Sequence, residues 1–221
     1  MTVTEKPPVV LVHGMGSTFE HNWRRHGWVD MLEAEGRAVV GFDLPGHGRS
    51  PGLTDATDTG VGRLLQLCES YGEVDLVAFS AGSVLSLSAA VRRPELFRRL
   101  VFLGLADTQL RVTRESMRAG ANDLDSPVMR SVRRAAERAG NDVATVLDWA
   151  RRAEAPPRFA DLARVTAPVL LVLGERDFLG EPDELLASLP QAQLVTLRDT
   201  DHFATTSQFE AKLVVLDFLM A

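Results

Sequence analysis

Several features that mark protein classes are missing or rare in this sequence. Its 221 residues contain a single cysteine, Cys68, so an intrachain disulfide framework and a cysteine-based zinc site are excluded. No apolar run reaches the roughly 18 residues of a membrane helix, and the amino-terminal residues lack the apolar stretch of a signal peptide. We therefore expect a cytoplasmic protein with no membrane partner. We also expect Cys68, which falls among leucines on a helix, to be buried in the core.

Basic residues are outnumbered by acids. The 24 Lys and Arg against 30 Asp and Glu give a formal net charge of -6, and they form no basic stripe, so nucleic acid is not expected as a partner. The 45% of apolar residues and 24% of charged residues are ordinary for a folded globular chain. A chain of this length suits one domain.

Short apolar runs alternate with amphipathic stretches of helical length. The runs are continuous instead of alternating in polarity, which is typical of parallel strands covered by helices on both faces. The sequence therefore predicts an α/β fold, a three-layer α/β/α sandwich with a six-stranded, mostly parallel sheet. The predicted strands are 9–12, 38–42, 74–79, 100–105, 169–173 and 193–197, and the predicted helices are 28–35, 60–71, 81–93 and 207–220.

Residues 107–165 interrupt this alternation, because they contain helix signals and no strand candidate. Ser126 is a predicted N-cap with Pro127 at the first helical position, and Gly140 stands just past the end of the same helix. We expect a helical cap over the strand ends, inserted into a single domain whose core is 1–106 and 166–221. The many charges of the cap are expected to be a solvated helix surface.

A search for the nucleophile-elbow pattern Gly-x-Ser-x-Gly finds residues 48–52, with Ser50 at the centre. This match is misleading. The elbow uses the backbone N–H of the residue after the serine as an oxyanion donor, and Pro51 has none. Ser50 also lacks an apolar strand running directly into it.

The better candidate nucleophile is Ser80, in Ala78-Phe79-Ser80-Ala81-Gly82. It follows the predicted strand 74–79 and opens the predicted helix from Ala81, the strand-turn-helix context that the chemistry requires. Small residues are needed two positions to either side because the turn is sharp. Ala78 stands where glycine is usual.

A nucleophilic serine needs a base, and the base needs an acid that orients it. His202 lies in the loop after the last predicted strand, and Asp177 follows the strand before it, so both fall at strand ends. The order Ser80, Asp177, His202 is that of an α/β-hydrolase triad. Asp107 is the reserve acid. Glu175 and Asp201 are expected to be surface or turn residues.

The oxyanion donors are expected from two loops. The glycines of His13-Gly14-Met15-Gly16, after the first predicted strand, let the backbone approach a substrate oxygen, so the N–H of Met15 would pair with that of Ala81. We expect His13 to hold this loop instead of acting as the base. Residues 21–28, with two tryptophans and two histidines, either line the pocket or pack elsewhere.

With these residues assembled, the sequence resembles the α/β-hydrolase family over most of its length. The resemblance rests on five motifs in the expected order, 13–16, 43–50, 78–82, 174–177 and 201–203. It implies that residues 43–50 form a scaffold loop in which His47 and Ser50 are structural. The family usually opens with an antiparallel strand pair, and because the first predicted strand begins at Val9, we expect this pair to be missing. Six strands in the order 2-1-3-4-5-6 are then expected.

The predicted function is a serine hydrolase without cofactor or metal that cleaves a small carboxylic ester, thioester or lactone through an acyl-enzyme. Its expected partner is a small-molecule acyl substrate. Two alternatives stay open. The same three side chains serve carbon–carbon bond hydrolysis, hydroxynitrile cleavage and perhydrolysis, and some members of the family with this triad are ligand receptors with little turnover.

Overall fold

The sheet confirms the predicted architecture. The computed structural model describes residues 6–221. The predicted absence of a signal peptide also concerns residues 1–5, which lie outside the described residues. All neighbouring strands pair in parallel, and their order is β2-β1-β3-β4-β5-β6. The strands are β1 (Val9–Val12), β2 (Val39–Phe42), β3 (Val74–Phe79), β4 (Phe97–Leu103), β5 (Val169–Gly174) and β6 (Ala192–Leu197).

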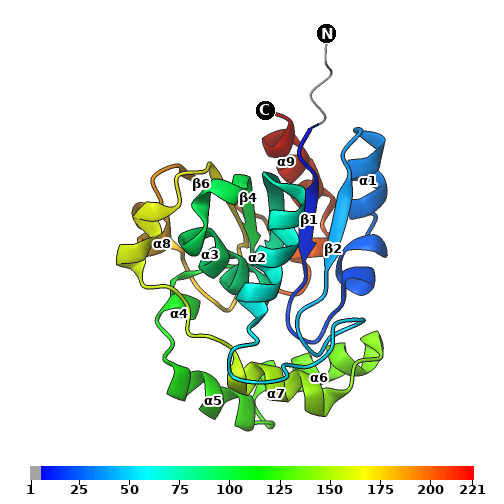
Figure 1. The fold of residues 1–221 in the computed structure, drawn as a ribbon, viewed down its shortest axis with the longest axis vertical. Helices are drawn as coiled ribbons and strands as arrows, with labels where there is room; N and C mark the ends of the chain where they lie inside the picture. The colour runs from blue at the N-terminus through cyan, green and yellow to red at the C-terminus, as the bar shows by residue number, and fades with distance from the viewer. Residues whose placement is uncertain (1–5) are drawn as a thin grey trace.

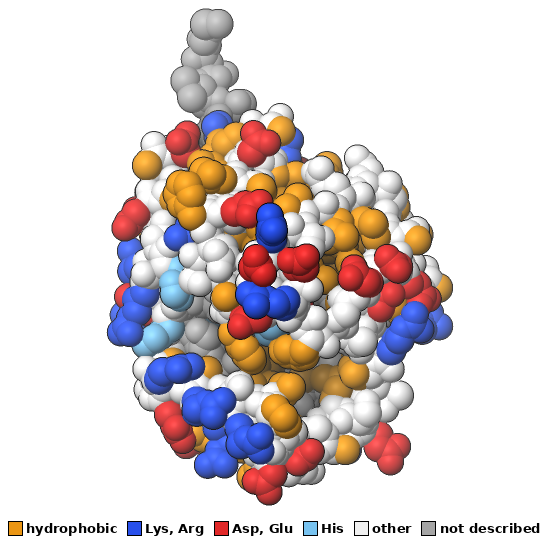
Figure 2. Space-filling view, turned by 180° about the vertical axis from the view of Figure 1, so that it is seen from behind, with side chains coloured by type: hydrophobic (Ala, Val, Ile, Leu, Met, Phe, Trp, Pro, Cys, Tyr) orange, Lys and Arg blue, Asp and Glu red, His pale blue; other side chains and the backbone are white. Residues whose placement is uncertain are grey.

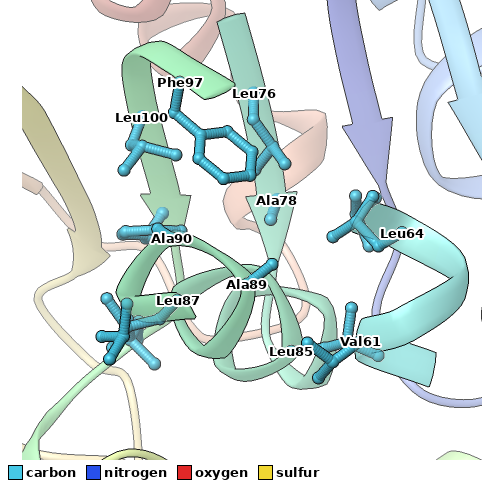
Figure 3. Close-up of a cluster of buried hydrophobic side chains, with 14 of the residues drawn as sticks. Val61, Leu64, Leu76, Ala78, Leu85, Leu87, Ala89, Ala90, Phe97 and Leu100 are labelled. Carbon is cyan, nitrogen blue, oxygen red and sulfur yellow. The ribbon is translucent and has the colours of Figure 1, made fainter. Parts of the chain in front are cut away.

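Helices cover both faces of this sheet. Along β1 the side chains of Val9 and Leu11 pack into one apolar cluster, and those of Val10 and Val12 pack into another, as the period of two in a strand requires. The first cluster includes α1 (Trp28–Ala34) and α9 (Phe209–Met220). The second includes α2 (Gly60–Tyr71), α3 (Ala81–Arg92) and α8 (Asp183–Ser188). Figure 3 shows the second cluster, in which Ala89 of α3 approaches Ala78 of β3, and Leu85 of α3 lies beside Val61 of α2.

The cap consists of helices, as the sequence predicts. Residues 107–165 form α4 (Asp107–Leu110), α5 (Arg114–Asn122), α6 (Pro127–Ala139), α7 (Val143–Arg152) and the 3₁₀ turn η3 (Phe159–Arg164). The Ser126 hydroxyl accepts a hydrogen bond from the N–H of Met129, and Gly140 ends α6 in the left-handed conformation. In Figure 1, α5, α6 and α7 lie across the end of the sheet toward which the strand arrows point.

Several predicted boundaries are wrong. The strand predicted at 100–105 begins at Phe97 and ends at Leu103, because Arg98 interrupts the apolar pattern and yet lies in β4, where its guanidinium pairs with buried Asp75. The helix predicted from residue 207 begins at Phe209, after a 3₁₀ turn (Thr205–Ser207).

Smaller elements escape the sequence-based prediction. Helix α8 and a single π-helical turn, η1 (Glu20–Arg24), are not predicted at all. The helices predicted at 28–35 and 81–93 each end one residue earlier, at Ala34 and Arg92. No helix within residues 6–221 combines the length and the apolar content needed to cross a bilayer.

Candidate active site

Ser80 occupies a strained turn between β3 and α3. Its φ of 53° and ψ of -119° place a non-glycine residue in a region that L-residues rarely adopt, and such strain is typical of functional positions. The Ser80 N–H donates to the Leu103 carbonyl of β4 at 2.9 Å, which fixes the turn to the sheet. A Cβ at Gly82 would lie 2.4 Å from the His13 carbonyl oxygen. The second position after the serine therefore has to be glycine.

The structure brings the three distant side chains of the predicted triad together. The Nε2 atom of His202 lies 2.9 Å from the Ser80 hydroxyl oxygen, and its Nδ1 atom lies 2.8 Å from Oδ2 of Asp177. Because an ionised carboxylate can only accept, the imidazole proton belongs on Nδ1, which leaves Nε2 free to accept from the serine hydroxyl. His202 is only 3% exposed, and the Asp177 side chain is fully buried.

The other candidate acids have structural contacts elsewhere. The Asp107 carboxylate accepts from the backbone N–H groups of Glu184 and Leu185 at 2.9 and 2.8 Å, so it caps the start of α8. Glu175 accepts from the N–H of Asp199, and Asp201 accepts from the N–H of Ala204. The reserve acid is therefore engaged away from the imidazole, and Glu175 and Asp201 stabilise turns.

The loop after β1 approaches the serine closely. A Cβ on Gly14 would lie 2.8 Å from the Phe79 ring and 3.3 Å from Cβ of Ser80, so only glycine fits there. Met15 and Ala81 both line the same cavity as Ser80. Within residues 6–221 neither the N–H of Met15 nor that of Ala81 donates a hydrogen bond to protein. Both predicted donors are free for a ligand oxygen.

Two buried histidines hold this loop. His13 Nε2 accepts from the N–H of Leu44 at 3.0 Å, and its Nδ1–H donates to the Gly14 carbonyl. His47 Nε2 accepts from the N–H of Gly16 at 3.0 Å. Burial, with the nearby His47 as a smaller cause, lowers the pKa of His13 to about 3, and burial also lowers the pKa of His47. Both rings are neutral structural residues, as expected for His13 and His47.

One residue of the cap was missed by the sequence-based prediction. Asn141, between α6 and α7, donates from Nδ2 to the carbonyls of Gly16 and Ser17 at 3.0 and 2.9 Å, and its Oδ1 accepts from the N–H of Gly48 at 2.8 Å. It thus ties the cap to the loop that carries Met15. These contacts join residues about 90 to 125 positions apart, so no local sequence pattern could predict them.

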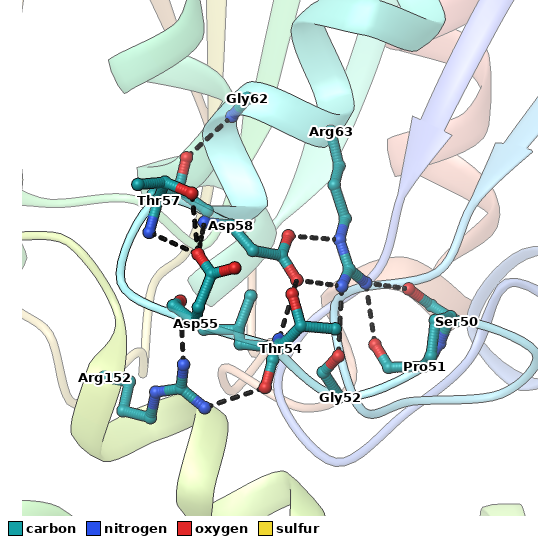
Figure 4. A network of polar contacts seen from close by, with 12 residues as sticks. Ser50, Pro51, Gly52, Thr54, Asp55, Thr57, Asp58, Gly62, Arg63 and Arg152 are labelled. Carbon is teal, nitrogen blue, oxygen red and sulfur yellow. Dashed lines mark hydrogen bonds and ion pairs between the residues drawn. The ribbon is translucent and has the colours of Figure 1, made fainter.

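Ser50 lies outside the site. Its hydroxyl oxygen accepts a hydrogen bond from Arg63 at 3.2 Å, and the same guanidinium pairs with Asp58. On the other side of this loop Arg152 of α7 donates to the carbonyls of Leu53 and Asp55 (Figure 4). The Gly-x-Ser-x-Gly match therefore belongs to a polar network that holds residues 50–58 between α2 and the cap.

The serine opens into a cavity of about 660 Å³ between the core and the cap. Figure 2 shows the surface hollowed there, with hydrophobic side chains around the hollow. The lining is mostly apolar, which suits a ligand held chiefly by hydrophobic contact. Its apolar residues include Met15, Leu53, Val61, Phe79, Val84, Leu85, Met117, Met129, Val132, Trp149, Phe178 and Phe203.

Some of residues 21–28 line the cavity and others pack in the core, the two alternatives that the sequence left open. His21, Asn22 and His26 line the cavity. Trp23 and Trp28 are fully buried and pack edge to face with ring centroids 5.2 Å apart.

Two further features lie outside this cavity. Cys68 is buried in the core as expected, and burial raises the pKa of its thiol to about 12. Among residues 6–221 there is no group of three or more His, Cys, Asp or Glu side chains placed to hold a metal ion.

Comparison with known proteins finds similar sequences that match part of the chain and similar folds that match nearly all of it. The chain is 28% identical over 141 residues to (E)-2-((N-methylformamido)methylene)succinate hydrolase of Acinetobacter baylyi, a match covering 57% of this chain and 51% of the relative. It is 35% identical over 113 residues to 2-hydroxy-6-oxo-2,4-heptadienoate hydrolase of Pseudomonas putida, covering 48% and 40%. The chain thus matches about half or less of the length of these relatives.

The solved structure of MenH from S. aureus superimposes with a TM-score of 0.79 at 18% identity, covering 99% of this chain and 95% of that one, which shows a shared fold. The sequence model described as "Alpha/beta hydrolase family" matches residues 9–214, nearly the whole chain. On this match, and on the order of strands and loops described above, the chain belongs to the alpha/beta hydrolase family.

Proposed function

We propose that the protein is a serine hydrolase that needs no cofactor and cleaves a small carboxylic ester, thioester or lactone through an acyl-enzyme. The observation that carries this proposal is the position of the His202 imidazole, hydrogen-bonded on one side to the Ser80 hydroxyl and on the other to the Asp177 carboxylate. Those three groups supply a nucleophile, a general base and an orienting acid.

Each side chain has one role in the proposed reaction. The Ser80 oxygen attacks the substrate carbonyl while Nε2 of His202 takes its proton, and Asp177 holds the proton-bearing Nδ1 and stabilises the imidazolium. The carbonyl oxygen becomes an oxyanion, which the N–H groups of Met15 and Ala81 would bind. The leaving group then takes the proton from Nε2. A water molecule, deprotonated by the same nitrogen, releases the acid and restores Ser80.

The cavity supports a small, largely apolar acyl substrate. Its volume of about 660 Å³ lies in the usual range for small-molecule sites, and few charged side chains line it. Of these, Arg152 is already bonded to backbone carbonyls and to Asp148. A neutral acyl group with a modest hydrocarbon chain fits this lining best.

Hydrolysis of a carbon–carbon bond is a second candidate, favoured by one comparison. The Pseudomonas putida relative is named for 2-hydroxy-6-oxo-2,4-heptadienoate, a compound without an ester, so its hydrolysis has to break a bond between carbons. The similarity covers 48% of this chain. An enzyme of this second kind would turn over a vinylogous 1,5-diketo acid much faster than a simple butyrate ester.

The test is turnover of p-nitrophenyl acetate and p-nitrophenyl butyrate by the purified protein and two serine variants. We expect multiple turnovers by the wild-type protein and a loss of about 10³-fold or more in kcat for Ser80→Ala. Ser50→Ala, the matched control, should keep its activity because Ser50 contacts Arg63 and not the imidazole.

Two results would count against the proposal. Near-normal turnover by Ser80→Ala would show that Ser80 is not the nucleophile. A single burst of one equivalent of p-nitrophenol per chain, with no further turnover, would indicate that the protein is a ligand receptor.

A further inference from the structure

Two half-exposed phenylalanines stand at the cavity beside the candidate triad. Phe178 directly follows Asp177, and Phe203 directly follows His202. They are 54% and 52% exposed, although they are large apolar side chains, and both line the cavity that contains Ser80. Their ring centroids lie 6.1 Å apart with planes inclined by 38°.

Both rings pack against the imidazole. The Phe178 centroid lies 4.8 Å from that of His202, and the Phe203 ring meets the imidazole edge to face at 5.3 Å. Phe79 contacts the same imidazole at 5.0 Å, but it is only 7% exposed. Phe79 therefore belongs to the buried wall, whereas Phe178 and Phe203 each keep about half of their surface free next to the imidazole.

The position of the leaving group follows from the chemistry of the proposed function. The departing oxygen or sulfur has to receive its proton from Nε2 of His202, so it lies within hydrogen-bond distance of that atom. The carbon atoms attached to it then extend along the surroundings of the imidazole. The carbonyl oxygen, in contrast, is directed toward the amides of Met15 and Ala81. Side chains that flank the imidazole at the exposed side of the cavity are thus placed to contact the alcohol or thiol part of a substrate.

We infer that Phe178 and Phe203 form the binding subsite for the leaving group, and that this subsite takes an aromatic alcohol or thiol. The inference rests on the proposed function and adds the substrate class. Aromatic rings pair in offset or edge-to-face arrangements with centroids about 4.5 to 7 Å apart. A planar ring on the leaving group can contact the free faces of both phenylalanines, and its binding removes their apolar surface from water.

The experiment compares butyrate esters of benzyl alcohol, cyclohexylmethanol and propanol. All three give the same acyl-enzyme, so differences in kcat/KM report the acylation step and the contacts of the alcohol. The variants are Phe178→Leu and Phe203→Leu, which keep an apolar side chain without the ring. Phe209→Leu is the matched control, because Phe209 is 69% exposed and does not line the cavity.

The wild-type protein is expected to favour the benzyl ester over the other two. Each of Phe178→Leu and Phe203→Leu should lower the benzyl-to-propyl ratio of kcat/KM by about threefold to tenfold, the range expected for the loss of one aromatic contact. Phe209→Leu should leave kcat/KM for both esters, and therefore their ratio, unchanged.

An unchanged benzyl-to-propyl ratio in both variants, with an active enzyme, would overturn the subsite and leave the proposed function standing. A loss that follows acyl length in propyl acetate and propyl hexanoate, instead of following the alcohol, would also overturn it, because the rings would then line the acyl site. If none of these esters is hydrolysed, or if their hydrolysis persists in Ser80→Ala, both the proposed function and the subsite would be overturned.

Discussion

The space for the imidazole of His202 depends on a residue without a side chain. Gly104 follows β4 with a φ of +60°, and a Cβ at this position would lie 2.8 Å from Cε1 of His202 and 3.0 Å from the Phe79 ring. Any larger residue would displace the imidazole from its present position. The position of the imidazole therefore depends on the absence of a side chain at Gly104.

Gly104→Ala is expected to lower kcat/KM for p-nitrophenyl butyrate by about 10²-fold, since a displacement near 1 Å at a reacting group has effects of that size. Gly140→Ala is the control, because Gly140 has a φ of +74° with no atom within 4 Å of the added Cβ. Both variants carry similar backbone strain, and Gly104→Ala adds the steric clash, so the melting temperature should fall in both and further in Gly104→Ala. Equal activity in the two variants would show that a Cβ at position 104 does not disturb the His202 imidazole.

The three side chains of the candidate triad were predictable because Ser80 directly follows β3, and Asp177 and His202 lie in the loops that follow β5 and β6. Carboxyl ends of parallel strands share one edge of the sheet, so Ser80, Asp177 and His202 had to lie near one another. The phenylalanines that follow Asp177 and His202 were not singled out for a role. Their packing against the imidazole depends on side-chain directions that the order of residues does not encode.

At the scale of elements, the cap controls the loop after β1. Val132 of α6 places its carbonyl oxygen 2.6 Å from the position of a Cβ on Gly16, and Asn141 binds the carbonyls of Gly16 and Ser17. The backbone around Met15 is thus clamped between the core and the cap. A change in Asn141 should alter the aim of the Met15 amide without touching the triad.

Asn141→Ala is expected to lower kcat for p-nitrophenyl butyrate by about 10-fold or more, with little change in KM, because an oxyanion donor acts in the transition state. Steady-state kinetics measure both constants. Thr145→Ala gives a cap control, since Thr145 bonds Asp142 within its own helix end. A rise in KM with constant kcat would show that Asn141 serves substrate binding instead of the oxyanion.

Elements that the sequence failed to predict share a dependence on distant contacts. Helix α8 has six residues, too few for a clear apolar period, and two of its first N–H groups are capped by Asp107, which lies 77 and 78 positions away in the sequence. The early start of β4 depends on Asp75, which neutralises Arg98. Long elements with local signals, such as α2 and α6 with its Ser126 cap, agree with prediction.

For the whole molecule, burial of neutral histidines makes stability depend on pH. The pKa of His13 is about 3 in the folded protein, against an ordinary value near 6.5 in the unfolded chain. Between these values the unfolded chain binds more protons than the folded one, so the free energy of unfolding rises with pH and falls on acidification. His47 acts in the same direction. Carboxylates with lowered pKa, such as Asp58, lose their contribution only below about pH 4.

We expect the free energy of unfolding to fall by roughly 1 kcal/mol per pH unit from His13 alone as the pH drops below about 6.5. Urea denaturation at pH 7.5, 6 and 5 measures this slope. In His13→Asn the slope should be smaller, although the variant starts from a lower stability. A free energy that stays constant or increases between pH 7.5 and 5 would contradict the neutral, buried state of His13.

We expect Ser80 to be the residue that becomes acylated. Labelling with a fluorophosphonate, followed by trypsin digestion and mass spectrometry, tests it directly because the two candidate serines fall in different peptides, 50–63 and 64–92. We predict one label per chain, in peptide 64–92 at Ser80, and no label in Ser80→Ala. A label in peptide 50–63, or labelling that persists in Ser80→Ala, would contradict it.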